Sequence, residues 1–206
     1  MSKTRDNILQ ASRLLFNTHG YDLVTIRMIA QKLNMSSGNL NYHFQKKEDI
    51  LETLYFDMVF HFDKRIDDLS KNNFTFPFIL SEIERSMHIM FDYRFFWTDL
   101  HHLINSNKKI KSHFIMAYQK RTQGSLFMFS KLQEDGLMQK LEEDWVPQFL
   151  TDSMIQYSNT WIYTMNIYRE DLIKKSDIEG KSKDLLRILY PYLTIEGKLK
   201  FKDAIK

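Results

Sequence analysis

The chain has 206 residues, of which 43% are hydrophobic and 14% aromatic, and this content excludes a disordered protein. Cysteine is absent, which excludes disulfide frameworks and thiolate metal sites. The net charge is +3, and residues 1–50 carry seven Lys and Arg against four Asp and Glu, whereas the remainder is balanced. A net-basic N-terminal unit on a neutral body is typical of a protein that meets a polyanion.

Chain breakers are scarce, with six Gly and three Pro in the whole sequence. Strands need frequent turns, so this scarcity predicts an all-helical fold of long helices with few connections. The N-terminus lacks the apolar run of a signal peptide, and no apolar stretch approaches the roughly 20 residues that span a bilayer. We therefore expect a cytoplasmic protein without a membrane segment.

Three short helices are predicted at the N-terminus. The first runs from about Thr4 to His19 and ends at Gly20, the second follows an N-cap at Thr25, and the third follows an N-cap at Ser36. Two short helices joined by a tight turn, the second of them polar outside, form the helix-turn-helix unit that places its second helix in the major groove of DNA.

The segments TIRMIA (residues 25–30) and LNYHFQKKEDIL (residues 40–51) carry a resemblance to a known family. They resemble the DNA-binding domain of the TetR/AcrR family of bacterial transcriptional regulators, and the resemblance covers about residues 5–52. It implies a helix-turn-helix domain at residues 1–52 and a larger helical domain at residues 53–206 for effector binding and dimerisation. It also implies a repressor that a ligand releases from double-stranded DNA.

The third helix supplies most of the candidate DNA contacts. An ordinary solvated polar face is the alternative, but a surface helix rarely exposes Tyr and His together beside two lysines. Asn binds adenine in bidentate fashion, and an aromatic edge packs on a thymine methyl group. We expect base contacts from Ser37, Asn39, Asn41, Tyr42 and His43, close backbone approach at Gly38, and phosphate contacts from Lys47, Thr25 and Arg27.

Longer helices are predicted over the remainder of the chain. Their expected ranges are 47 to about 70, 77 to about 93, 96–104, 109–134 and 147–168, with a turn at 71–73 and a last helix that Ser182 caps and Pro191 closes. Large apolar residues on more than one face of the last two long helices predict a homodimer on a palindromic operator.

The aromatic and Met residues of the larger domain are expected to form mostly core. Large apolar cavities with a few polar groups hold small ligands between helices, so an effector pocket is also expected. The candidate lining residues are Met58, Phe62, Tyr118, Tyr157 and Trp161, and the expected effector is a small apolar or amphipathic molecule. We expect no cofactor.

Two other functions remain open from the residues alone. A metal-dependent enzyme would use Asp99, His101 and His102, but adjacent His side chains on a helix point about 100° apart, so we expect no metal site. A helical adaptor that binds only protein would share the dimer surface without needing Lys47 or the Tyr42–His43 face.

Overall fold

The structure, a computed structural model, describes residues 3–69 and 74–206, and over these ranges it contains helices and no β-strand. The all-helical prediction is thereby confirmed, and the turn expected at 71–73 lies outside the described residues. The elements are α1 (Lys3–His19), α2 (Ile26–Lys32), α3 (Ser37–His43), α4 (Lys47–Leu69), α5 (Phe76–Asp92), α6 (Arg94–Thr98), α7 (Leu100–Ser106), α8 (Lys108–Glu134), α9 (Val146–Tyr168), α10 (Asp177–Arg187), the 3₁₀ turn η1 (Tyr190–Tyr192) and α11 (Ile195–Ala204).

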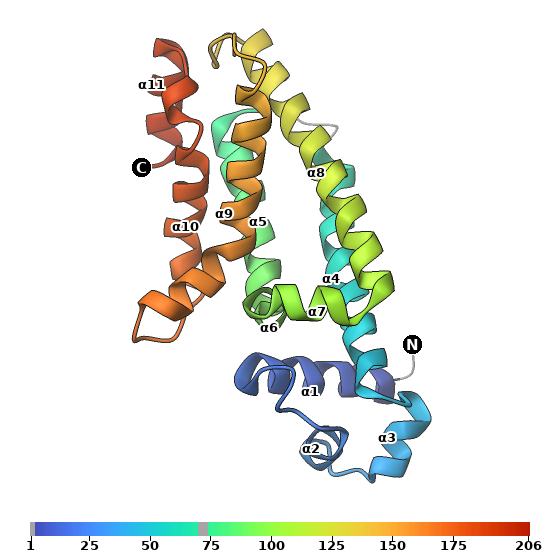
Figure 1. Cartoon of the computed structure of the whole chain (residues 1–206). Coiled ribbons are helices and arrows are strands. Elements are labelled where there is room, and N and C mark those ends of the chain that lie inside the picture. The colour runs from blue at the N-terminus through green and yellow to red at the C-terminus, as the bar shows by residue number, and fades with distance from the viewer. Residues whose placement is uncertain (1–2, 70–73) are drawn as a thin grey trace.

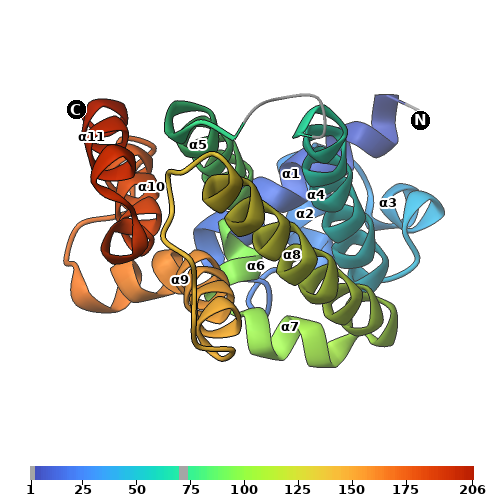
Figure 2. The ribbon, with the colours of Figure 1, turned by 90° about the horizontal axis from the view of Figure 1, so that it is seen from above.

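The helices form two lobes (Figure 1). A small lobe contains α1, α2 and α3, and a large lobe contains α5 to α11. Helix α4 begins beside α3 and continues into the large lobe, where α5 and α8 flank it (Figures 1 and 2). Helix α4 is thus one continuous helix that belongs to both lobes.

Local signals in the sequence explain the small lobe. The Thr25 hydroxyl accepts a hydrogen bond from the backbone N–H of Met28 at 3.2 Å, and the Ser36 hydroxyl accepts one from that of Asn39 at 3.1 Å. These bonds cap α2 and α3 as predicted. Gly20 ends α1 with φ of +81°, a conformation that costs Gly little. The shared core includes Ile8, Phe16, Ile29, Ala30, Leu40 and Phe44, all buried.

The side chain of Asn17 joins the two lobes. Its Nδ2 donates to the backbone carbonyl of Asp92 at 2.9 Å, and its Oδ1 accepts from the backbone N–H of Phe95 at 3.0 Å. Asp92 ends α5 and Phe95 lies in α6, so one amide on α1 bonds to both sides of the α5–α6 corner. Beside this contact the guanidinium of Arg13 lies 4.8 Å from the centre of the Tyr93 ring. The orientation of the small lobe is therefore tied to this corner.

The single helix expected at 96–104 is wrong, because the chain forms α6 and α7 with a break at Asp99. Asp99 has φ of −126° and ψ of 35°, outside the helical region. The three consecutive aromatic residues of α6, Phe95, Phe96 and Trp97, are all buried. A longer straight helix would expose part of this apolar run, so the chain turns at Asp99 and keeps the run covered.

The expected end of the chain is also wrong in two respects. Ser182 lies inside α10, fully buried, and its hydroxyl donates to the carbonyl of Glu179, so it is not an N-cap. Helix α10 starts at Asp177, whose carboxylate accepts from the backbone N–H of Lys174 at 2.7 Å. A further helix, α11, follows Pro191 and is capped by Thr194. Helix α11 is short, and apolar residues follow no clear helical spacing along it, so no sequence signal indicated this last element.

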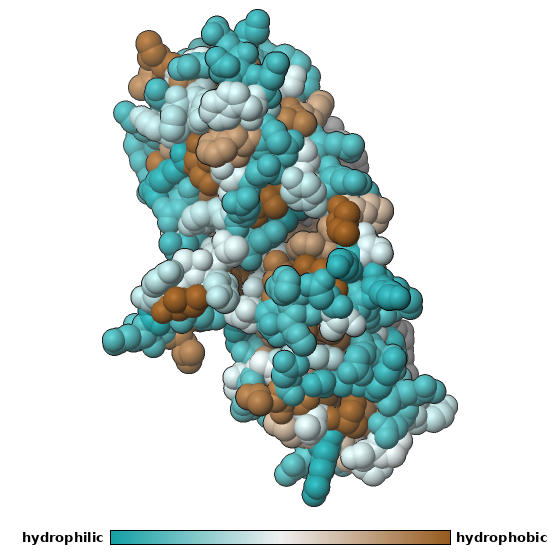
Figure 3. All heavy atoms as spheres, in the orientation of Figure 1, coloured by the Kyte–Doolittle hydropathy of each residue, from teal (hydrophilic) through white to brown (hydrophobic). Residues whose placement is uncertain are grey.

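Most of the outer surface is hydrophilic, with separate hydrophobic patches on the face that carries α8 and α9 (Figure 3). None of the described helices is long and apolar enough to cross a membrane.

Candidate nucleic-acid interface

Helix α3 presents a polar outer face supported by a buried inner face. Leu40 and Phe44 are buried against the rest of the small lobe. On the other side Tyr42 is 85% exposed, and its ring meets the half-buried His43 ring edge to face at 5.3 Å between centroids. Ser37, Gly38, Asn39 and Asn41 are also exposed. The structure thus brings every predicted base-contacting residue to one short helix that is free to enter a groove.

Two predicted phosphate-contacting residues lie at the start of α2. Thr25 and Arg27 are both exposed, but the Thr25 hydroxyl is already occupied as the N-cap acceptor. The hydroxyl can still donate its own hydrogen to a phosphate oxygen, since capping uses only a lone pair. Both residues are therefore compatible with a contact to the DNA backbone.

The predicted phosphate contact Lys47 is held by the small lobe itself. Its Nζ donates to the backbone carbonyl of Tyr21 at 2.9 Å and to that of Asp22 at 3.4 Å, and it lies 4.1 Å from the centre of the Tyr21 ring. The ammonium group has three donors, so one remains for a phosphate. Lys47 therefore links the first turn of α4 to the α1–α2 turn.

Burial and nearby acids shape this α1–α2 turn electrostatically. Burial raises the pKa of the Tyr21 hydroxyl, and the carboxylates of Glu48 and Asp22 raise it further. Tyr21 is consequently neutral at physiological pH and offers the Lys47 ammonium an aromatic face. The positive charge of Lys47 is thus positioned by a neutral ring and two carbonyls.

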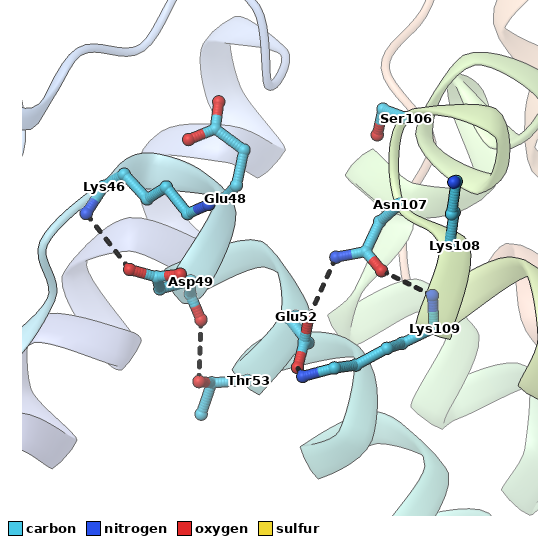
Figure 4. A pocket seen from close by; sticks show the side chains of 9 residues that line it. All are labelled: Lys46, Glu48, Asp49, Glu52, Thr53, Ser106, Asn107, Lys108 and Lys109. Atoms are coloured by element: carbon cyan, nitrogen blue, oxygen red, sulfur yellow. Dashed lines mark hydrogen bonds and ion pairs between the residues drawn. The ribbon is translucent and has the colours of Figure 1, made fainter.

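A cavity of about 500 Å³ lies between the first turns of α4 and the junction of α7 and α8 (Figure 4). Within it Glu52 accepts hydrogen bonds from Asn107 at 3.0 Å and from Lys109 at 2.8 Å. These bonds lower the pKa of Glu52, which stays ionised. The Asp49 carboxylate accepts from the backbone N–H of Lys46 and closes the start of α4. The cavity is open and charged, which suits fastening α4 in place better than holding an apolar effector.

The predicted effector-pocket residues do not line either of the two described cavities. Met58 and Trp161 are buried in the core, and Phe62 and Tyr157 are half-buried. The Tyr118 hydroxyl donates to Asp152 at 2.7 Å on the outside of α8 and α9. Their assignment to a pocket stays a prediction.

Of the two adjacent histidines that follow Asp99, only His102 lies in a group of possible metal ligands. His102 and Asp99 approach Asp22 of the α1–α2 turn, and the imidazole Nε2 of His102 lies 3.5 Å from an Asp22 carboxylate oxygen. His101 is exposed and is not a member of this group. Burial raises the pKa of Asp99, and the nearby Asp22 carboxylate adds to the rise.

Sequence reasoning missed Asn17, Tyr21 and Asp22, which connect the interface to the rest of the molecule. Asn17 and Asp22 contact residues more than 70 positions away in the sequence, and residue spacing within a helix cannot predict such contacts. The sequence GYD at residues 20–22 reads only as a turn.

The fold and this interface define a helix-turn-helix DNA-binding protein with a second helical lobe. Two family profiles match the chain: one described as "Bacterial regulatory proteins, tetR family" over residues 8–54, and one described as "Bacterial transcriptional repressor" over residues 58–201. The chain belongs to the TetR family. It is a DNA-binding transcriptional regulator, and the alternative that gave Asp99, His101 and His102 a catalytic role is not supported.

Solved structures share the fold over nearly the whole chain. A TetR-family transcriptional regulator from Marinobacter aquaeolei VT8 is 24% identical with a TM-score of 0.89, covering 99% of this chain and 98% of its own. A protein from Saccharomonospora viridis in complex with choline is 20% identical with a TM-score of 0.69, covering 94% and 100%. A gamma-butyrolactone receptor described as ArpA-like is 12% identical with a TM-score of 0.67, covering 98% and 94%. No curated protein matches the chain.

Proposed function

We propose that this regulator is a homodimeric repressor that binds a palindromic operator through α3 and leaves it when a small effector binds the large lobe. The observation that carries the proposal is the two-sided character of α3, whose inner face is buried while Tyr42 and its polar neighbours are exposed. In this arrangement Ser37, Asn39, Asn41, Tyr42 and His43 contact bases, and Gly38 lets the backbone approach the DNA.

Phosphate contacts flank this reading helix on two sides. Thr25 and Arg27 lie at the start of α2, and Lys47 lies at the start of α4, where free backbone N–H groups and the helix dipole favour an anion. Because α4 continues from Lys47 into the large lobe, we place the boundary between the DNA-binding domain (1–52) and the effector and dimerisation domain (53–206) inside this helix.

A stripe along α9 supports a twofold dimer. Phe149, Gln156, Thr160, Tyr163 and Ile167 are exposed at spacings of seven, four, three and four residues, which places them on one face of the helix. Phe149, Tyr163 and Ile167 are each at least half exposed, an unusual state for large apolar side chains in one row. Self-pairing of such a stripe gives a closed dimer that matches a palindromic operator.

Most of the apolar residues that the last predicted helix was expected to offer to this dimer are buried within the chain. Leu185, Leu186, Leu189 and Leu193 are buried within the same chain, where α10 packs against α5 and α9. Met154, Ile155, Ile162 and Met165 of α9 are likewise buried. Over α9, the large apolar side chains that remain at least half exposed are Phe149, Tyr163, Ile167 and Tyr168, and the first three belong to the α9 stripe.

Light scattering on the purified protein tests the dimer. Tyr163→Glu places a charge in the centre of the α9 stripe and is expected to give monomers. Leu172→Glu is the matched control, because Leu172 is 84% exposed and lies outside the helices. A Tyr163→Glu protein that remains dimeric contradicts the assignment of this face.

Unpartnered donors in the core of the large lobe support an effector site there. The Nε1 atoms of Trp97 and Trp161 and the hydroxyl of Thr151 are buried and have no hydrogen-bond partner in the described part of the chain. Trp97 lies in α6, and the other two lie in α9, which packs against it. A buried donor without a partner costs about 1–3 kcal/mol, which an acceptor on a ligand offsets. We therefore propose an amphipathic effector with hydrogen-bond acceptors, with Met58, Phe62, Tyr118 and Tyr157 as further contacts.

Helix α4 carries the signal from this region to the DNA. The Tyr55 hydroxyl on α4 is hydrogen-bonded to Nδ1 of His113 on α8 at 2.8 Å, and the Tyr93 hydroxyl donates to Asp57 of α4. An effector that shifts α8 or the α5–α6 corner moves α4 and changes the separation of the two reading helices. That separation must stay near one DNA turn, about 34–36 Å.

The test pairs a thermal-shift screen with operator binding. We expect an amphipathic compound that raises the melting temperature and weakens operator affinity by about 5–150-fold, a coupling of roughly 1–3 kcal/mol. Trp97→Phe and Trp161→Phe remove the proposed donors and should weaken the compound while leaving affinity for DNA unchanged. A compound shown to occupy the large lobe at saturation without changing operator affinity refutes the release mechanism.

A further inference from the structure

The group formed by Asp22, Asp99 and His102 draws its members from both lobes. Asp22 lies in the α1–α2 turn of the small lobe, Asp99 lies at the break between α6 and α7, and His102 lies in α7. Each offers one ligand atom, and the three atoms lie within 4.8 Å of one another. The fold brings these side chains together across about 80 residues of sequence.

The spacing of these atoms suits a bound metal ion. Two ligands that each lie 2.0–2.1 Å from a tetrahedral zinc ion are separated by roughly 3.4 Å. The distance from Nε2 of His102 to the Asp22 carboxylate is 3.5 Å, so this pair already has the required separation. The ligand atom of Asp99 lies within 4.8 Å of the other two, so a shift of at most about 1.4 Å completes three ligands and leaves a fourth position for water.

The charge of the group also favours a cation. Two carboxylates and one imidazole offer ligand atoms within 4.8 Å of one another here, so negative charge is concentrated at the group. Over the described ranges of the chain, no Lys or Arg side chain forms an ion pair with either carboxylate. The side chains of His102 and Asp22 are 53% and 64% exposed, so an ion can enter from solvent.

We propose that Asp22, Asp99 and His102 bind a divalent transition-metal ion of the zinc type that bridges the small and large lobes. One imidazole nitrogen with two carboxylate oxygens suits Zn²⁺, whereas Mg²⁺ and Ca²⁺ prefer oxygen ligands alone. The sequence offered Asp99 and His102 only together with His101, a pairing that helix geometry argued against, and it gave no reason to add Asp22, which is distant along the chain.

A bound ion would act on the support of the DNA interface. The backbone carbonyls of Tyr21 and Asp22 hold the ammonium of Lys47, and the Asp22 carboxylate is a ligand of the ion. The ion therefore fixes the α1–α2 turn against α7 and restricts the motion of the small lobe relative to the large one.

Isothermal titration of the full untagged chain with ZnCl₂ at pH 7.5 tests the site, since neutral imidazole and ionised carboxylates are the binding forms. We expect one ion per chain. His102→Ala, Asp99→Asn and Asp22→Asn should each weaken binding by at least about tenfold. His101→Ala is the matched control, an exposed histidine one position away, and should bind as the wild type does. MgCl₂ in place of ZnCl₂ should bind far more weakly.

Each other outcome overturns part of the proposal in a definite way. Unchanged Zn²⁺ affinity in His102→Ala, or equal loss in His101→Ala, refutes the site. Unchanged affinity in Asp22→Asn alone refutes the bridge between lobes. Hydrogen exchange gives an independent readout: Zn²⁺ should slow exchange at residues 21–24 in the wild type and leave it unchanged in His102→Ala. Circular dichroism verifies that each variant is folded.

Discussion

The contact made by Asn17 predicts how strongly the two lobes are joined. Asn17→Ala removes the bond from Nδ2 to the Asp92 carbonyl at 2.9 Å and the bond from the Phe95 N–H to Oδ1 at 3.0 Å. Each such bond contributes about 0.5–1.5 kcal/mol, so their joint loss should lower the free energy of unfolding by about 1–3 kcal/mol. For a chain of this size that corresponds to roughly 2–4 °C in melting temperature for each kcal/mol.

Urea denaturation followed by two probes locates the effect. Trp fluorescence reports the large lobe, because the three Trp residues at positions 97, 145 and 161 all lie there, whereas circular dichroism reports both lobes. We expect Asn17→Ala to separate the two transitions, with the small lobe unfolding at lower urea. Thr18→Ala is the control, since its exposed hydroxyl bonds only to the Leu14 carbonyl of its own helix, and it should change stability by less than about 0.5 kcal/mol.

Asn17→Asp distinguishes the two bonds. The carboxylate keeps an acceptor for the Phe95 N–H but turns an oxygen toward the Asp92 carbonyl, so it should destabilise at least as much as the Ala variant. If Asn17→Ala is as stable as Thr18→Ala and its two transitions coincide, the α5–α6 corner does not hold the small lobe and the reasoning fails.

Three further predictions follow from particular contacts. Lys47→Met should weaken binding to all DNA sequences and reduce the slope of log affinity against log salt concentration by about one unit, measured by fluorescence anisotropy over a salt series. If the variant is less stable but the slope is unchanged, Lys47 only holds the α1–α2 turn. Asn41→Ala and Tyr42→Ala should each cost about 1–3 kcal/mol at particular base pairs in a binding-site selection, whereas an even loss over all sequences would make them backbone contacts. Gly197→Ala should lower the free energy of unfolding in urea by about 1–3 kcal/mol or more, because the new Cβ would lie 1.9 Å from the Leu137 carbonyl oxygen. Gly180→Ala is the control, and it should raise the free energy of unfolding by about 0.4–1 kcal/mol because the space around its Cβ is open. Equal effects of the two substitutions would contradict the packing of α11.

Local chemistry accounts for the parts of the fold that the sequence predicted. Thr25 and Ser36 are strong N-caps followed by helical apolar spacing, so the residues at which α2 and α3 start could be predicted. Pro77 and Pro147 likewise lie in the first turns of α5 and α9. The outward face of α3 follows from the burial of Leu40 and Phe44, which determines the residues that face solvent.

The errors arise where tertiary contacts outweigh local signals. Ser182 has the chemistry of an N-cap but is buried against α5, where its hydroxyl also reaches Glu84 at 3.4 Å. The break at Asp99 comes from covering three aromatic residues in sequence, and periodicity alone predicts one continuous helix there. Asp22 reaches His102 only after both lobes have folded and met.

Footprinting of genomic DNA with the purified protein tests the central claim most directly. The account predicts protected sites that share one palindrome, with half-sites spaced by one helical turn of about 10–10.5 base pairs or a multiple of it, and loss of that pattern in Tyr42→Ala. Protection without a common sequence, or protection of an unchanged palindrome by the Tyr42→Ala and Asn41→Ala variants alike, would contradict the assignment of α3 as the reading helix.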